Sequence, residues 1–187
     1  MLKLHVIAVS TRPGRAGFPV AQWFVERAKE HGKFEVRLVD LREANLPVFD
    51  EPRHPRLKQY EHAHTKAWSA TIDAADAFVF VTPEYNFSTP SSLINAIDFL
   101  SAEWSYKPAA FVSYGGASGG VRSVQMAKLL LTSLKVVPIP ESVAVSMFQN
   151  HVNETKEFVG TEQHVKSASG MLDELLRWAG ALKGLRA

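Results

Sequence analysis

Residues 77–82, AFVFVT, form a short apolar run that ends directly at the turn residues PEYN of 83–86, and this run decides the fold class. Its length and lack of polar alternation predict a strand buried on both faces. We predict four further strands, at 2–9, 34–41, 109–113 and within 136–145. Apolar residues at helical spacing predict five helices, at 18–29, 61–75, from Thr89-Pro90 onward, 121–134 and 162–182. Alternating strands and helices predict an α/β protein with a doubly wound parallel sheet covered by helices on both faces.

The overall composition narrows the class of protein. The 187 residues suit one domain spanning 1–187, and the chain is long enough to bury a proper core. With no cysteine, the chain has no disulfide, thiolate nucleophile or Cys-ligated metal site, and this composition fits a cytoplasmic protein. A net charge of +2 with scattered cations gives little support for nucleic-acid binding. No apolar run approaches the roughly 20 residues that span a bilayer.

Ligands of doubly wound sheets bind at the carboxyl ends of the strands, where the strand order reverses. We therefore expect the site in three loops: the first loop (residues 10–17), the second loop (82–89) and the third loop (113–120). All three are unusual in composition. Their agreement in position is the strongest indication of function within the sequence.

The first loop, STRPGRAG, precedes a predicted helix and carries two hydroxyls and two arginines. Helix N-termini and arginine side chains both bind phosphate, so this loop fits a phosphate monoester; an ordinary turn with surface arginines is the alternative. A Walker loop is excluded because no Gly-Lys-Ser/Thr follows. A dinucleotide-binding fingerprint needs three glycines in this loop, and only Gly14 and Gly17 are present, which disfavours a dehydrogenase. Asp40, the acidic residue at the end of the second predicted strand, is therefore interpreted as a loop or capping residue.

The other two loops fit a planar ring. The second loop brings Tyr85, Asn86 and Phe87 beside the expected phosphate site, although the two aromatic residues would also suit simple packing or a subunit interface. The third loop, SYGGASGG, has few bulky side chains, which allows a ring to approach the main chain; a merely flexible loop is the alternative.

Together these loops resemble the NADPH-dependent FMN reductase family, which includes quinone, chromate and azo-dye reductases. The resemblance covers about residues 3–145 and is most specific in 82–99, TPEYNFSTPSSLINAIDF. It implies a flavodoxin-like sheet with strand order 2-1-3-4-5. It further implies three groups of FMN ligands: phosphate ligands Ser10, Arg12, Arg15, Gly17 and Phe18; ring contacts Pro83, Glu84, Tyr85 and Asn86; and, at the pyrimidine end, Ser113, Tyr114, Gly115 and Gly116.

The resemblance also implies the reaction. NADPH or NADH would deliver hydride to bound FMN, and a small acceptor would then take the electrons at the same face, without a catalytic acid, base or nucleophile from the protein. Two alternatives are an FMN electron carrier of the flavodoxin type, which is usually more acidic than this chain, and a binding protein that has lost flavin. The family is typically dimeric or tetrameric, which makes Phe87 and Trp104 candidates for an oligomer contact.

Several residues are given structural interpretations. His54, His62 and His64 are expected to be solvated, because positions 62 and 64 do not share a face of a helix, so no metal is expected. The basic segment 53–58 is interpreted as a solvated loop; the alternative is that it overhangs the site and attracts the 2′-phosphate of NADPH. Trp23 and Trp178 fall on apolar helical faces and are expected in the core.

Overall fold

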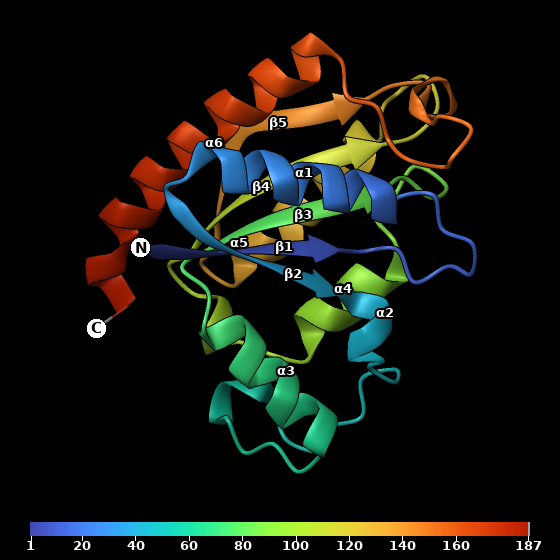
Figure 1. The fold of residues 1–187 in the computed structure, drawn as a ribbon. Helices are drawn as coiled ribbons and strands as arrows, with labels where there is room; N and C mark the ends of the chain where they lie inside the picture. Colours follow the sequence, from blue (N-terminus) through green and yellow to red (C-terminus); the bar gives the residue numbers. More distant parts are fainter. Residues whose placement is uncertain (187) are drawn as a thin grey trace.

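The computed structural model describes residues 1–186 (Figure 1). The sheet contains five strands: β1 (Leu2–Ala8), β2 (Phe34–Asp40), β3 (Ala77–Pro83), β4 (Pro108–Tyr114) and β5 (Val137–Val145). The α-helices are α1 (Phe18–His31), α2 (Leu41–Ala44), α3 (Ala63–Asp73), α4 (Ser91–Asp98), α5 (Val121–Ser133) and α6 (Glu162–Leu182). The predicted strands and the bounds of α6 are confirmed, whereas the four-residue α2 was not expected.

The strands are parallel throughout and lie in the order β2-β1-β3-β4-β5, as the resemblance implied. The order reverses between β1 and β3, and ligands of such sheets bind outside the carboxyl ends of the strands at this point. β5 lies at the edge, and its register against β4 shifts between Ala109 and Phe111, beside Pro138 and Pro140. An edge strand tolerates proline because one side of its backbone has no hydrogen-bonding partner.

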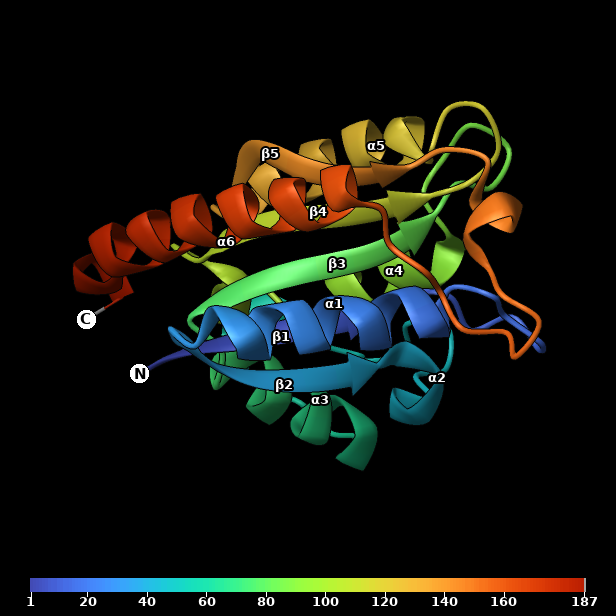
Figure 2. The same ribbon diagram turned by 45° about the horizontal axis from the view of Figure 1, so that its top comes forward.

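Each face of the sheet is covered by helices. Figure 2 shows α1 and α6 side by side on one face, with α3, α4 and α5 on the other. One core cluster joins α1 and α6 to alternate residues of β1, β3 and β4, including Val6 and Val79. The second joins the remaining helices to the intervening residues, including Ile7 and Phe80. The three inner strands are thus buried on both sides, which explains their continuous apolar sequence.

Two of the tryptophan predictions are wrong. Trp104 is fully buried and packs against Trp68 and Phe78, so it is a core residue of this chain and not an oligomer contact. Trp178 is 37% exposed because it lies on the outer side of α6. Trp23 is partly buried against the α1–α6 core, as expected. Apolar spacing alone could not identify which tryptophan the other helices would cover.

The start of α4 also differs from the prediction. The helix begins at Ser91, with Pro90 as the N-cap and no side-chain cap. Thr89 was expected to cap it, but its hydroxyl is buried without a hydrogen-bond partner among the described residues. Ser92 Oγ instead donates to the carbonyl of Val9, at a distance of 2.8 Å. This bond fixes the start of α4 against the end of β1.

The histidine segment is arranged differently from the prediction. His62 is the N-cap of α3 and not a member of the helix, so its ring stacks on that of His64 at 5.1 Å between centroids. Both rings face Asp50, with His64 Nε2 3.0 Å from its carboxylate. Within residues 1–186, no three His, Cys, Asp or Glu side chains are arranged to hold a metal ion. In the same range, no helix combines the length and hydropathy needed to cross a membrane.

Candidate functional site

The three loops meet at one edge of the sheet, where the arrowheads of β1, β3 and β4 lie together (Figures 1 and 2). Direct contacts join them. Ser10 of the first loop and Tyr85 of the second share a hydrogen bond of 2.9 Å between their hydroxyl oxygens. Gly17 of the first loop lies against the ring of Tyr114, the second residue of the third loop. The loops singled out by composition therefore form one continuous surface.

The first loop leaves the N-terminus of α1 uncapped. Gly17 is the N-cap and makes no side-chain cap bond, and Phe18 and Pro19 begin the helix. Helices carry partial positive charge and unpaired N–H groups at this end. Arg12 is exposed and forms no ion pair among the described residues. This end of α1 therefore offers unused N–H donors and an exposed cation to an anion.

Arg15 has a different environment. Its guanidinium forms a two-pronged ion pair with Asp40 at the end of β2 and also donates to the carbonyl of Ser10. The hydrogen bond with Asp40 raises the pKa of Arg15 further above its ordinary value. Asp40 also caps α2 by accepting from the backbone N–H of Arg42, at 2.9 Å. Capping by Asp40 was expected, but its pairing with Arg15 was missed, and this pair holds the first loop to β2.

The second loop contains a tight turn. Tyr85 and Ser88 exchange both backbone hydrogen bonds, at 3.0 and 2.9 Å, while Asn86 and Phe87 between them have φ values of 50° and 64°. Two successive left-handed residues define the type I′ turn, a conformation that is costly for phenylalanine. The turn leaves Tyr85, Asn86 and Phe87 exposed above the strand ends, whereas Pro83 is buried. Strain of this kind is common at functional sites.

Glu84 joins the second loop to the third. Its carboxylate accepts from Ser118 Oγ at 3.0 Å, from the backbone N–H of Arg122 at 3.2 Å and from Arg122 Nη1 at 2.6 Å. Burial opposes ionisation, but the bonds from Arg122 and Ser118 lower the pKa of Glu84 below its usual value. The Arg122 guanidinium also lies 4.2 Å from the centroid of the Phe87 ring. Arg122 and Ser118 were missed because their importance depends on this contact between loops.

The third loop is shaped by its glycines and by the chain after β5. Gly120 has a φ of 82°, and a Cβ there would lie 2.8 Å from the carbonyl oxygen of Tyr114, so glycine is required. The backbone N–H groups of Met147 and Phe148 donate to Gly116 and Gly115, both at 2.9 Å. The side of Gly116 is open, with no atom within 4 Å of a Cβ built there. The backbone is therefore both fixed and accessible.

The pyrimidine-end residues differ in what they offer. Ser113 is buried, and its Oγ has no hydrogen-bond partner among residues 1–186. Tyr114 is also buried, and this burial raises the pKa of its phenol above the ordinary value. An unpartnered buried hydroxyl, an open glycine backbone and an uncapped helix end together fit a ligand with both a polar heterocycle and a phosphate. FMN has both groups.

A cavity of about 560 Å³ opens beside the first loop, between α2 and α4. Thr11, Arg42, Ser91 and Ser92 are among its polar lining residues. The basic segment 53–58 is not at this edge. Arg53 and Arg56 line a separate cavity with Ser101, just after α4, and Ser133, the last residue of α5. In this chain the segment does not overhang the three loops, so that alternative is wrong, and its exposed cationic side chains agree with the solvated-loop interpretation.

Comparison with known proteins agrees with this geometry. The family model described as NADPH-dependent FMN reductase matches residues 2–150. An NAD(P)H-dependent FMN reductase of Schizosaccharomyces pombe is 37% identical over 180 residues, covering 92% of this chain and 90% of the relative. A Saccharomyces cerevisiae protein of the same name is 36% identical, covering 69% of this chain and 73% of the relative.

Among solved structures, the flavoenzyme NAD(P)H:(acceptor) oxidoreductase FerB from Paracoccus denitrificans superimposes with a TM-score of 0.76. It is 21% identical, and the match covers 97% of this chain and 98% of FerB, so it supports the fold. The sequence matches, in contrast, cover the residues that form all three loops. On those matches, this chain belongs to the NADPH-dependent FMN reductase family.

Proposed function

We propose that this protein oxidises NAD(P)H through FMN bound at the strand ends and passes the electrons to a small oxidised acceptor. The observation that carries the proposal is the meeting of three dissimilar loops at the reversal of strand order: an uncapped helix end, an aromatic turn and an open glycine backbone. Family membership supports the same cofactor and the same electron donor.

For the FMN phosphate, we propose Arg12, Ser10 and the backbone N–H groups at Gly17 and Phe18 as ligands. Arg12 is the exposed cation of the first loop, and the α1 N-terminus lies next to it in the chain. Arg15 is assigned a positioning role, because Asp40 and the Ser10 carbonyl already occupy its guanidinium. This assignment modifies the role that the resemblance implied.

A pair of variants tests the two roles. Arg12→Ala should weaken FMN binding about tenfold or more while leaving the free energy of unfolding of the apoprotein nearly unchanged, because charge-assisted bonds contribute about 1.5–3 kcal/mol. Arg15→Ala should lower the stability of the apoprotein, because it leaves Asp40 buried without its partner. The reverse pattern in fluorescence titrations and urea denaturation would overturn the assignment.

For the ring, we propose contacts with Pro83, Tyr85 and Asn86 of the turn, with Glu84 holding the turn in place. At the pyrimidine end of the ring we propose contacts with the backbone of Gly115 and Gly116. Ser113 and Tyr114, the first two residues of the third loop, complete this set of ligands. The open side of Gly116 and the unpartnered Ser113 hydroxyl support this orientation.

When bound, FMN supplies the hydride and electron transfer chemistry. The residues of this chain bind and orient the ring, and the main-chain N–H groups of the third loop stabilise negative charge near its pyrimidine end. No acid, base or nucleophile from the protein is required. We accordingly assign no catalytic side chain.

Four further properties extend the proposal. The acceptor is a small molecule such as a quinone, an azo dye, a metal oxyanion or free flavin, since quinone reductases are among the relatives of this chain. A homodimer or homotetramer is proposed, with Phe87, which is 71% exposed, as a contact candidate. A cytoplasmic location and a single FMN-binding domain spanning residues 1–187 complete it.

The deciding experiment is an absorbance spectrum of protein reconstituted with FMN and desalted, followed by anaerobic addition of NADPH and then NADH. Retained flavin bands that bleach rapidly support the reductase, and the faster donor defines the nicotinamide preference. Bands that persist without bleaching favour an FMN electron carrier. Loss of all flavin on desalting would overturn the proposal.

A further inference from the structure

A second cavity, of about 700 Å³, lies at the opposite edge of the sheet from the three loops. Its walls come from the residues just before β3 and β4, the turn after α5 and the chain after α6. Because every strand is parallel, this edge contains the beginnings of the strands and is separated from the flavin loops by the whole length of the sheet. The flavin chemistry described above does not use it.

The lining of this cavity is strongly basic. Five cationic side chains line it against two carboxylates, Asp73 and Asp76; the cations are Lys58, Lys107, Lys135, Lys183 and Arg186. Arg186 forms an ion pair with one of these carboxylates: its Nη2 lies 3.0 Å from Asp76 Oδ1. Lys183 forms no ion pair within residues 1–186. For a chain with a net charge of only +2, this is a marked local excess of positive charge.

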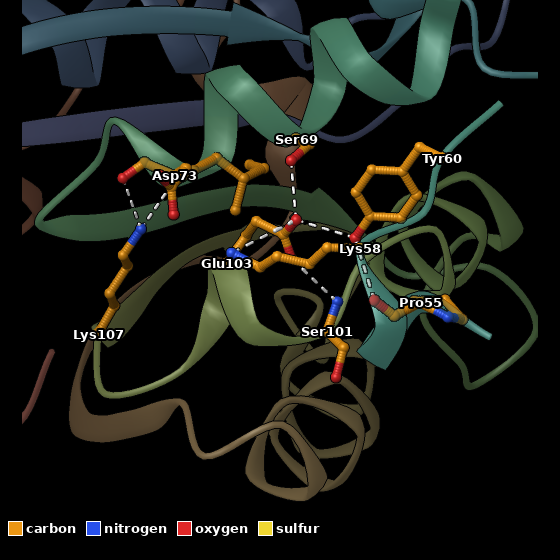
Figure 3. A network of polar contacts seen from close by, with 9 residues as sticks. Pro55, Lys58, Tyr60, Ser69, Asp73, Ser101, Glu103 and Lys107 are labelled. Carbon is orange, nitrogen blue, oxygen red and sulfur yellow. Dashed lines mark hydrogen bonds and ion pairs between the residues drawn. The ribbon is translucent and has the colours of Figure 1, made fainter. Parts of the chain in front are cut away.

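Two of the lysines contact polar groups inside the protein (Figure 3). Lys107 is buried, and its Nζ donates to the carbonyls of Ile72 and Asp73, at 2.8 and 3.0 Å, at the carboxyl end of α3. Lys58 Nζ lies 4.0 Å from the buried carboxylate of Glu103. That carboxylate also accepts hydrogen bonds from Ser69 Oγ and Tyr60 Oη, at 2.8 and 2.9 Å, so several partners stabilise its negative charge.

Tyr106 and Lys135 form the strained part of the wall. Both are left-handed, with φ values of 59° and 61°, and the Tyr106 N–H donates to the Lys135 carbonyl at 2.9 Å. Lys135 Nζ lies 3.1 Å from the Tyr106 hydroxyl and 5.1 Å from the centroid of its ring. Non-glycine residues in this conformation cost free energy, and such strain is concentrated at sites that bind ligands. The strain here places a cation and an aromatic hydroxyl together at the cavity.

The positive field at this edge also affects neighbouring groups. His5 of β1 is buried, and burial followed by the charges of Arg37, Lys107 and Lys3 lowers its pKa to about 4. Burial, helped by Arg186, lowers the pKa of Lys107 to about 8, even though Asp73 and Asp76 act in the opposite direction. Burial is the main cause of both shifts, and the neighbouring cations add to it.

We propose that this cavity is a binding site for a small anion of the diphosphate class, held by Lys135 and Lys183 with Tyr106 as a hydroxyl donor. Two ammonium groups and a hydroxyl suit the several oxygens of a diphosphate, and lysine binds phosphate as a compact point charge. The volume exceeds that of inorganic pyrophosphate and suits a nucleoside diphosphate, for which the Tyr106 ring offers a stacking face.

The test uses FMN-saturated protein, so that the first loop cannot bind the probe. Pyrophosphate and ADP are titrated separately by calorimetry, in chloride buffers of equal ionic strength. Lys135→Ala/Lys183→Ala should weaken the binding of pyrophosphate at least tenfold. Lys33→Ala/Lys166→Ala removes the same charge from exposed positions outside the cavity and should change the dissociation constant less than twofold. Thermal unfolding confirms that both variants fold.

A second readout does not depend on variants. Pyrophosphate binding in the cavity should raise the pKa of His5, which NMR titration of its ring protons measures. ADP binding more tightly than pyrophosphate supports a nucleotide ligand, and equal affinities support the diphosphate group alone. The proposal is overturned if pyrophosphate produces no binding heat, if both double variants weaken its binding equally, or if the pKa of His5 is unchanged at saturation.

Discussion

Gly17→Ala tests whether close packing of Gly17 against the Tyr114 side chain holds the first loop to the third. A Cβ at residue 17 would lie 1.8 Å from Tyr114 Oη and 2.1 Å from its Cζ. Attractive contacts between carbon atoms need about 3.5–4.0 Å, so the ring would have to retreat by roughly 2 Å. Gly17 has a φ of −82°, which alanine adopts without strain. The substitution therefore isolates a steric conflict.

The size of the effect follows from the burial of Tyr114, which is 7% exposed and packs against Phe148 at 5.3 Å between ring centroids. Because the ring is enclosed, it cannot simply rotate into solvent. Overpacking of this kind costs about 1–3 kcal/mol. In a chain of this size, that loss lowers Tm by about 2–12 °C. Calorimetry of the apoprotein measures the loss, and fluorescence titration should show weaker FMN binding, since the start of α1 is displaced.

The control is Gly170→Ala, in the middle of α6, where a new Cβ meets no atom within 4 Å. It should raise the free energy of unfolding by about 0.5–1 kcal/mol, because alanine favours helix more than glycine does. In a Tyr114→Ala background, Gly17→Ala should cost less than about 0.5 kcal/mol. An equal cost with and without the Tyr114 ring would refute the steric explanation.

Three further predictions concern the core and the ion pairs. Asp40→Asn should lower the free energy of unfolding by about 3 kcal/mol in urea, because it leaves the Arg15 guanidinium, 10% exposed, without its charged partner. Glu30→Gln, in the exposed pair with Arg27, should cost less than about 1 kcal/mol, and equal losses would contradict the proposed role of the buried pair. Since the folded pKa of His5 is depressed from 6.5 to about 4, the folded state binds fewer protons than the unfolded state, and the wild type should lose stability as pH falls through that window. His5→Leu should remove up to about 3 kcal/mol of this pH dependence, and unchanged dependence in the variant would contradict the assignment. Trp104→Ala should cost about 3–5 kcal/mol while leaving the molar mass in light scattering unchanged; a change in assembly without loss of stability would contradict its place in the core.

The sequence was sufficient for the strands because their signal is local. Continuous apolar runs such as 77–82 predict strands buried on both faces, and Pro138 and Pro140 are compatible with the edge position that β5 occupies. The bounds of α6 were also correct, since Thr161 supplies a capping box and the apolar spacing extends to Leu182. In each case the neighbours that decide the structure lie within a few residues along the chain.

The remaining features depend on partners far apart in sequence. Arg15 and Asp40 meet only because β2 lies beside β1, and Glu84 reaches Arg122 only because the loops after β3 and β4 are adjacent. Burial of Trp104 requires α3 and β3 to pack over it, which no periodicity in its own segment reveals. The left-handed turn at Asn86 and Phe87 carries no glycine, and a phenylalanine gives no sequence signal for the left-handed conformation that residue 87 adopts.

The single carboxylate of Glu84 has a kinetic consequence for cofactor exchange. It joins the two loops proposed to contact the flavin ring, through bonds to Ser118 of the third loop and to Arg122 at the start of α5. Neither loop can move aside alone without breaking these bonds, which opposes release of the cofactor. Such coupling lengthens the residence time of a ligand more than it changes its rate of capture. Glu84→Gln should accordingly accelerate FMN dissociation while leaving the association rate nearly constant, a difference that stopped-flow fluorescence resolves.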